Sequence, residues 1–262
     1  MRWRAVRIFC LTLGLLILAS FPWGPLFAWS PWKPGYRHFP AQWTDVYIPD
    51  GFRKKPAYDQ LDRYLREGES YLRLPAKKRI VVVLCPDWQH FQRYALVAGK
   101  GVGAVAIATG TAIYVSPKLD EKGLDHGEFL KHEMAHALIH QHQNVAAAYA
   151  FAKVEWLAEG IAVSFGDQKS YVTQETFLQR ARTEELLPVI DPALRSPTYD
   201  MRFSYIAWKN FVEFLMREDR DVFQKYLEAT MRRPANWREL FQQTYGNTFA
   251  AAVARFQERL RN

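Results

Sequence analysis

Four histidines and one glutamate fall within residues 131–144, which read KHEMAHALIHQHQN. His132 and His136 lie four positions apart, so on a helix both side chains project from one face and can share one metal ion. Glu133 stands beside them, within reach of a metal-bound water that it can deprotonate. The HEMAH pattern therefore predicts a catalytic zinc site of the H-E-x-x-H type, although a chance pentapeptide on an exposed helix would read the same.

A catalytic zinc ion usually takes three protein ligands and one water, so a third ligand is needed. His140 continues the stripe, but it lies about 12 Å from His132 along a helix axis, too far to share one ion. His142 has the spacing of the third histidine in the metzincin pattern H-E-x-x-H-x-x-G-x-x-H. Ile139, however, replaces the glycine that lets that chain leave the helix, which disfavours His142.

The segment VEWLAEGIAVSF, residues 154–165, offers two further candidates. Glu155 and Glu159 lie one helical turn apart, and from the residues alone either carboxylate could face the ion.

HEMAH followed by WLAEG resembles the gluzincin metallopeptidases, and above all their aminopeptidase branch, where a W-L-x-E-G segment carries the third zinc ligand. The resemblance is good over residues 125–166 and loose over 80–262. It implies that His132, His136 and Glu159 are the zinc ligands and that Glu133 is the general base.

Two features depart from the gluzincin pattern. The connection between the motifs is longer than in the aminopeptidases, so Glu155 stands at their numerical spacing. We still expect Glu159, since a loop can lengthen while the ligand keeps its neighbours. Val163 stands where thermolysin-like enzymes carry an aspartate that orients a ligand histidine, which leaves the partner of that histidine unidentified.

The resemblance also implies a side-chain donor to the oxyanion of the reaction, a tyrosine or histidine from the helical half. Tyr205 is our candidate and Tyr199 the reserve, although Tyr205 also fits the apolar stripe of a helix. The strand TGTAIYVSP, residues 109–117, would by the same pattern be an edge strand that pairs with the substrate backbone. It lacks the G-x-M-E-N segment of aminopeptidases and any acidic residue for a substrate ammonium, which predicts cleavage inside peptides.

The remaining periodicity predicts an α+β fold of the thermolysin-like, gluzincin kind. Residues 57–74 have the spacing of an amphipathic helix, residues 79–87 read as a buried strand, and 89–99 as a short helix. Residues 104–117 read as strand with a turn or bulge at Gly110. Asp125 and Glu128 have capping-box spacing, so the motif helix should begin there and run to about Asn144. The chain should be mainly helical from about residue 145 to its end.

The first thirty residues differ from the rest. Arg2, Arg4 and Arg7 precede the uncharged apolar run IFCLTLGLLILASF, which predicts a signal peptide or an N-terminal membrane anchor. By the positive-inside rule, the catalytic domain should face the periplasm or the exterior, and the protein should be secreted if the leader is cleaved. Residues 31–55 should form an extended linker, and residues 56–262 the peptidase domain.

Composition agrees with an exported enzyme. The formal charge of +8 includes no run of five or six basic residues, so nucleic acid is not an expected partner. Cys10 lies in the apolar run, which leaves Cys85 without an intrachain disulfide partner. We expect zinc-dependent hydrolysis of peptides or proteins. The alternatives are a metal-dependent hydrolase of another bond, or a membrane-tethered interaction protein with a structural metal site.

Overall fold

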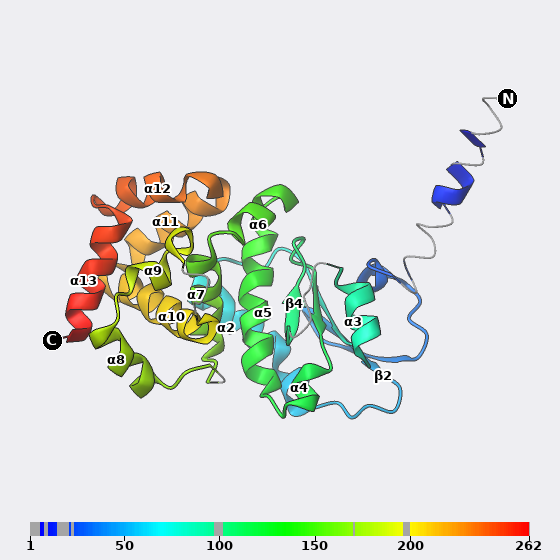
Figure 1. Ribbon diagram of the computed structural model, residues 1–262. Helices are drawn as coiled ribbons and strands as arrows, with labels where there is room; N and C mark the ends of the chain where they lie inside the picture. The colour runs from blue at the N-terminus through cyan, green and yellow to red at the C-terminus, as the bar shows by residue number, and fades with distance from the viewer. Residues whose placement is uncertain are drawn as a thin grey trace.

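The computed structural model describes residues 6–7, 10–14, 21, 24–96, 102–169, 171–195 and 200–261, and Figure 1 traces the chain. A small sheet lies toward the N-terminal side, and the C-terminal half is mainly helical. The expected mixed architecture is thus confirmed. No helix in these described ranges combines the length and the apolar character needed to cross a bilayer. Half of the predicted leader, residues 1–30, lies outside them.

The sheet has five strands in the order β1-β2-β3-β5-β4. The strands are β1 (Tyr36–Pro40), β2 (Thr44–Pro49), β3 (Ile80–Leu84), β4 (Ala104–Ala106) and β5 (Ala112–Val115). β3 pairs in parallel with β2 and β5, whereas β1–β2 and β4–β5 are antiparallel. β4 is therefore an edge strand. The segment 109–117, which we expected at the edge, contains β5 and lies inside the sheet, so that prediction was wrong.

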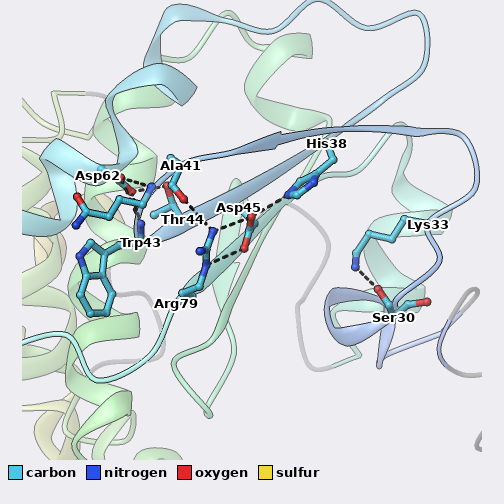
Figure 2. Close-up of polar contacts among 10 residues, drawn as sticks. Ser30, Lys33, His38, Ala41, Trp43, Thr44, Asp45, Asp62 and Arg79 are labelled. Atoms are coloured by element: carbon cyan, nitrogen blue, oxygen red, sulfur yellow. Dashed lines mark hydrogen bonds and ion pairs between the residues drawn. The ribbon is translucent and has the colours of Figure 1, made fainter.

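Residues 31–55 are extended, but they differ from the linker we expected. Their strands β1 and β2 form a hairpin, and β2 continues the sheet next to β3. Figure 2 shows the polar contacts that fix this hairpin. The Asp62 carboxylate accepts hydrogen bonds from the backbone N–H of Gln42 at 2.8 Å and the hydroxyl of Thr44 at 2.8 Å. Asp45 contacts Arg79 at 2.9 Å.

Alternating side chains of the central strands pack into two separate apolar clusters, one on each face of the sheet. Val82 of β3 and Ile113 of β5 face the helices α2 (Leu61–Leu72) and α5 (His126–Gln141). On the opposite face, Val83 and Tyr114 pack with the 3-10 turn η1 (Phe27–Trp29) and the helix α3 (Trp88–Tyr94). Burial of both faces explains why these strands read as continuous apolar runs.

The C-terminal half is built around two adjacent helices, α7 (Glu155–Gly166) and α10 (Met201–Glu218). Its other elements are α6 (Val145–Phe151), α8 (Gln174–Thr183), α9 (Leu187–Ile190), η3 (Pro192–Leu194), α11 (Arg220–Arg232), η4 (Pro234–Asn236), α12 (Trp237–Tyr245) and α13 (Phe249–Arg261). Two short elements belong to the N-terminal half: η2 (Pro56–Gln60) before α2, and α4 (Lys118–Glu121) before α5. α5 stands between the sheet and this helical half (Figure 1).

Candidate metal centre

The helix α5 carries the HEMAH motif and begins where the sequence predicts. The Asp125 side chain accepts hydrogen bonds from the backbone N–H of Gly127 at 2.6 Å and of Glu128 at 3.3 Å, so it caps the helix. The helix ends at Gln141, close to the expected Asn144. The motif histidines therefore sit in a regular helix whose four-residue spacing puts them on one face.

The helix α7 brings the WLAEG segment beside α5. Trp156 is fully buried, and its ring packs against several aromatic rings of the helical half, among them Phe211 at 5.4 Å and Phe249 at 5.0 Å between centroids. Gly160 permits close packing of α7 on α10, since a Cβ there would lie 2.8 Å from the carbonyl oxygen of Trp208. With Trp156 and Gly160 held in the core, Glu159 is left on the side that faces α5.

His132, His136 and Glu159 come together as one cluster. Their ligand atoms all lie within 4.8 Å of one another. Nε2 of His132 is 3.1 Å from Nε2 of His136, and the Glu159 carboxylate is 3.4 Å from the first ring and 3.6 Å from the second. Two imidazole nitrogens and one carboxylate oxygen are the donor set of many catalytic zinc sites, so the residues present fit that ion.

The electrostatics of the cluster favour a charged carboxylate. Burial alone would raise the pKa of Glu159, but the neighbouring His136 and His132 outweigh burial and hold that pKa well below its usual range. Burial likewise works to lower the pKa of His136, and Glu159 and Glu133 reverse this effect to a net rise. An anionic Glu159 beside two imidazoles is the arrangement that a divalent cation requires.

Glu133 lies next to the cluster but is held by the sheet. Its carboxylate accepts a hydrogen bond from the backbone N–H of Ala106 in β4 at 2.6 Å, and its other oxygen is 4.0 Å from Nε2 of His132. The carboxylate is thus fixed beside the three metal-facing atoms. A base in this place can take a proton from a water molecule at the cluster.

The other ligand candidates point elsewhere. His142 has Nε2 2.8 Å from the carbonyl oxygen of Pro75, and His140 has Nδ1 3.0 Å from that of Ile107. Glu155 forms an ion pair with Arg195. The cluster therefore contains neither the metzincin-like histidine nor the glutamate at the aminopeptidase spacing.

A cleft of about 1050 Å³ opens over the cluster. Its walls include β4 and its flanks on one side, and α6, α7 and the start of α10 on the other, so Tyr205 lines it as expected. Tyr199 lies outside the described residues. Tyr171, which sequence reasoning missed, also lines the cleft, and its ring stacks on that of Tyr205 with centroids 4.7 Å apart. No periodic or motif signal marks Tyr171, because it lies in a loop.

Burial, followed by the charges of Glu159 and Glu133, raises the pKa of Tyr171 far above its ordinary value. The phenol is therefore protonated at neutral pH and able to donate a hydrogen bond.

Comparison with known proteins gives one kind of match. No protein-family model and no curated protein matches the sequence. Among solved structures, the chain is similar to a crystal structure of a two-domain M1 zinc metallopeptidase, a mutant bound to L-tryptophan, with a TM-score of 0.50 and 14% sequence identity. The match covers 87% of this chain and 51% of that one, so the chain spans about half the length of that metallopeptidase. At this identity the likeness is one of fold.

Proposed function

We propose that this chain is a zinc-dependent peptidase that cleaves within peptides. The observation that carries the proposal is the convergence of His132, His136 and Glu159 within 4.8 Å, with the Glu133 carboxylate fixed beside them at the floor of a large cleft. The fold shared with an M1 zinc metallopeptidase supports the same class of chemistry.

In the proposed reaction, His132, His136 and Glu159 hold the ion. Zinc, when bound, supplies a Lewis acid that acidifies water and polarises the substrate carbonyl. Glu133 accepts a proton from the attacking water and passes it to the leaving amine. Tyr205 donates a hydrogen bond to the oxygen that becomes negatively charged, and the stacked Tyr171 is the alternative donor.

The edge strand β4 supports an extended peptide as substrate. Ile107 N–H donates to Ala112 at 3.0 Å and Ser116 N–H to Gly103 at 2.9 Å, so these positions of β4 and its flanks face β5. In an antiparallel pair the intervening residues face away, which leaves Ala104 and Ala106 on the open side. Ala106 holds Glu133, and Ala104 is placed to pair with a substrate backbone.

The charges around the cleft favour internal cleavage over trimming from the amino end. Among the described residues that line it, Glu133 and Glu159 are the only acids, and both belong to the catalytic cluster. The other charged groups are the cations Lys118, Lys122 and Arg202. A free substrate ammonium therefore has no further carboxylate to bind.

We also propose that the catalytic domain acts outside the cytoplasm, tethered by its apolar N-terminal segment or released from it. The basis is the arginine-flanked apolar run of residues 8–21 and the absence of acidic residues before residue 31 in the sequence. Protease protection of the chain in sealed vesicles would test this orientation.

Glu133→Gln tests the reaction. The variant should bind zinc as the unaltered chain does, because Glu133 is not among the proposed ligands, yet lose nearly all hydrolysis of a mixed peptide library. Glu155→Gln is the matched control and should stay active. An active Glu133→Gln enzyme refutes the mechanism. Zinc binding without any peptide cleavage by the unaltered chain would favour another hydrolase or a structural metal site.

A further inference from the structure

One polar atom of the candidate metal centre is buried and has no partner. Nε2 of His132 faces His136 and Glu159, while Nδ1 on the other side of the ring makes no hydrogen bond to any residue that the structure describes. An imidazole that offers Nε2 to a metal is neutral and carries its hydrogen on Nδ1. A buried N–H normally has an acceptor, so the ring lacks one that it requires.

A second buried polar side chain near His132, that of Gln168, also lacks a hydrogen-bond partner among the described residues. Gln168, just after the end of α7, is only 2% exposed and lines the cleft. Within the described part of the chain, neither its amide oxygen nor its amide nitrogen finds a hydrogen-bond partner. A primary amide contains a strong acceptor and two donors, so its burial without a partner also calls for an explanation.

The two groups are neighbours because residue 166 is glycine. A Cβ built on Gly166 would lie 3.3 Å from Cγ of Gln168 and 3.3 Å from Cβ of His132, so both carbons flank the same point. Each carbon is two bonds away from the polar atom in question, Oε1 in the glutamine and Nδ1 in the histidine. This proximity of the two carbons is compatible with a hydrogen bond between Oε1 and Nδ1 after rotation of the Gln168 side chain.

We propose that Gln168 is the positioning residue of His132, its Oε1 accepting the hydrogen of Nδ1 when Nε2 binds zinc. This inference rests on the proposed function. Gln168 would take the role that Val163 cannot fill, because the alkyl side chain of Val163 accepts no hydrogen bond from a ligand histidine. Such a partner fixes the tautomer and the plane of the ligand ring, and its removal typically weakens metal binding about 10–100-fold.

The test measures the zinc Kd of the 262-residue chain by competition with a chelator. Gln168→Leu keeps the size of the side chain but cannot accept a hydrogen bond, and should raise Kd about 10–100-fold. Gln168→Glu retains an acceptor and should restore Kd to within about threefold of the unaltered chain, or tighten it. Gln224→Leu is the matched control, because Gln224 is 9% exposed, has an unpartnered amide oxygen and lies in α11.

A second readout separates positioning from folding. Without zinc, Gln168→Leu should melt no lower than the unaltered chain, because it removes an amide that has no partner there. The rise in Tm on adding zinc should shrink in Gln168→Leu and not in Gln224→Leu.

The inference is overturned if folded Gln168→Leu binds zinc within about threefold of the unaltered chain, or if the Leu and Glu variants are weakened equally. The first result would leave the proposed function intact. If the unaltered chain binds no zinc at all, the proposed function and the inference fall together.

Discussion

The backbone N–H of Ala106 donates a 2.6 Å hydrogen bond to the carboxylate of Glu133, which ties the candidate base on α5 to the edge strand of the sheet. The position of the base therefore depends on a backbone amide hydrogen, which among the standard residues only proline lacks. A proline ring is tolerated on an edge strand. We use this relationship for the first prediction.

Ala106→Pro should keep zinc and the fold but lower kcat about 100-fold, the order of loss that a 1 Å misplacement of a catalytic group can cause. Ala106→Gly, which keeps the N–H, should retain most of the activity. Zinc content and Tm are measured alongside kcat. Equal activity of the two variants would show that the contact does not position the base.

The zinc ligands can be separated from their rivals by metal analysis. Glu159→Ala should lose zinc, because one of three donors disappears. Glu155→Ala and His142→Ala should retain it, since those side chains contact Arg195 and Pro75. Full zinc retention in Glu159→Ala with loss in either of the others reverses the assignment.

The two stacked tyrosines of the cleft can be compared directly. Tyr205→Phe should reduce kcat about 100 to 1,000-fold, the usual loss when one oxyanion donor is removed. Tyr171→Phe should have a smaller effect if its ring mainly supports Tyr205. Rate constants on one peptide, with zinc content as the control, decide between them. If Tyr171→Phe has a strongly reduced kcat while Tyr205→Phe stays active, Tyr171 is the oxyanion donor.

The mode of cleavage can be read from blocked peptides. Because the described cleft has no acidic residue beyond Glu133 and Glu159, N-terminal acetylation should leave the cleavage rate within about threefold, whereas loss of one charged hydrogen bond would cost more. Mass spectrometry of the products checks this. Stepwise trimming of free peptides with rejection of every acetylated one contradicts the prediction.

Stability should fall in mild acid because of a buried histidine at the start of α5. Burial, followed by the charge of Lys55, lowers the pKa of His126 below its ordinary 6.5. Nδ1 of the ring forms a hydrogen bond of 3.0 Å with the hydroxyl of Tyr58. As pH falls below 6.5 the unfolded chain therefore binds a proton that the folded chain resists, and stability declines until the lower folded pKa is passed.

His126→Gln should flatten the Tm of the metal-free protein between neutral and mildly acidic pH, at some cost in stability at neutral pH. A histidine on the exposed sheet edge, His38→Gln, is the control. If the Tm of His126→Gln declines with pH as steeply as that of the unaltered chain, another group is responsible for the acid sensitivity.

The sequence by itself determined the local features of this protein. The spacing of His132 and His136, the Asp125 cap and the helical period depend on neighbours within a turn or two, so the motif helix could be predicted from residues 125–144. The neighbours of Glu159 likewise explain why its side chain faces α5. Trp156 is buried in the core and Gly160 packs closely on α10, which leaves Glu159 on the remaining side of the helix.

Only the tertiary structure decided which distant groups meet. It assigned the sheet edge to β4 and not to residues 109–117, since strand order depends on pairing between segments far apart in the chain. It turned His142 toward Pro75, paired Glu155 with Arg195, and brought the loop residues Gln168 and Tyr171 to the cleft. Loop side chains have no period that a sequence pattern can reveal, so their positions follow from packing of the whole chain.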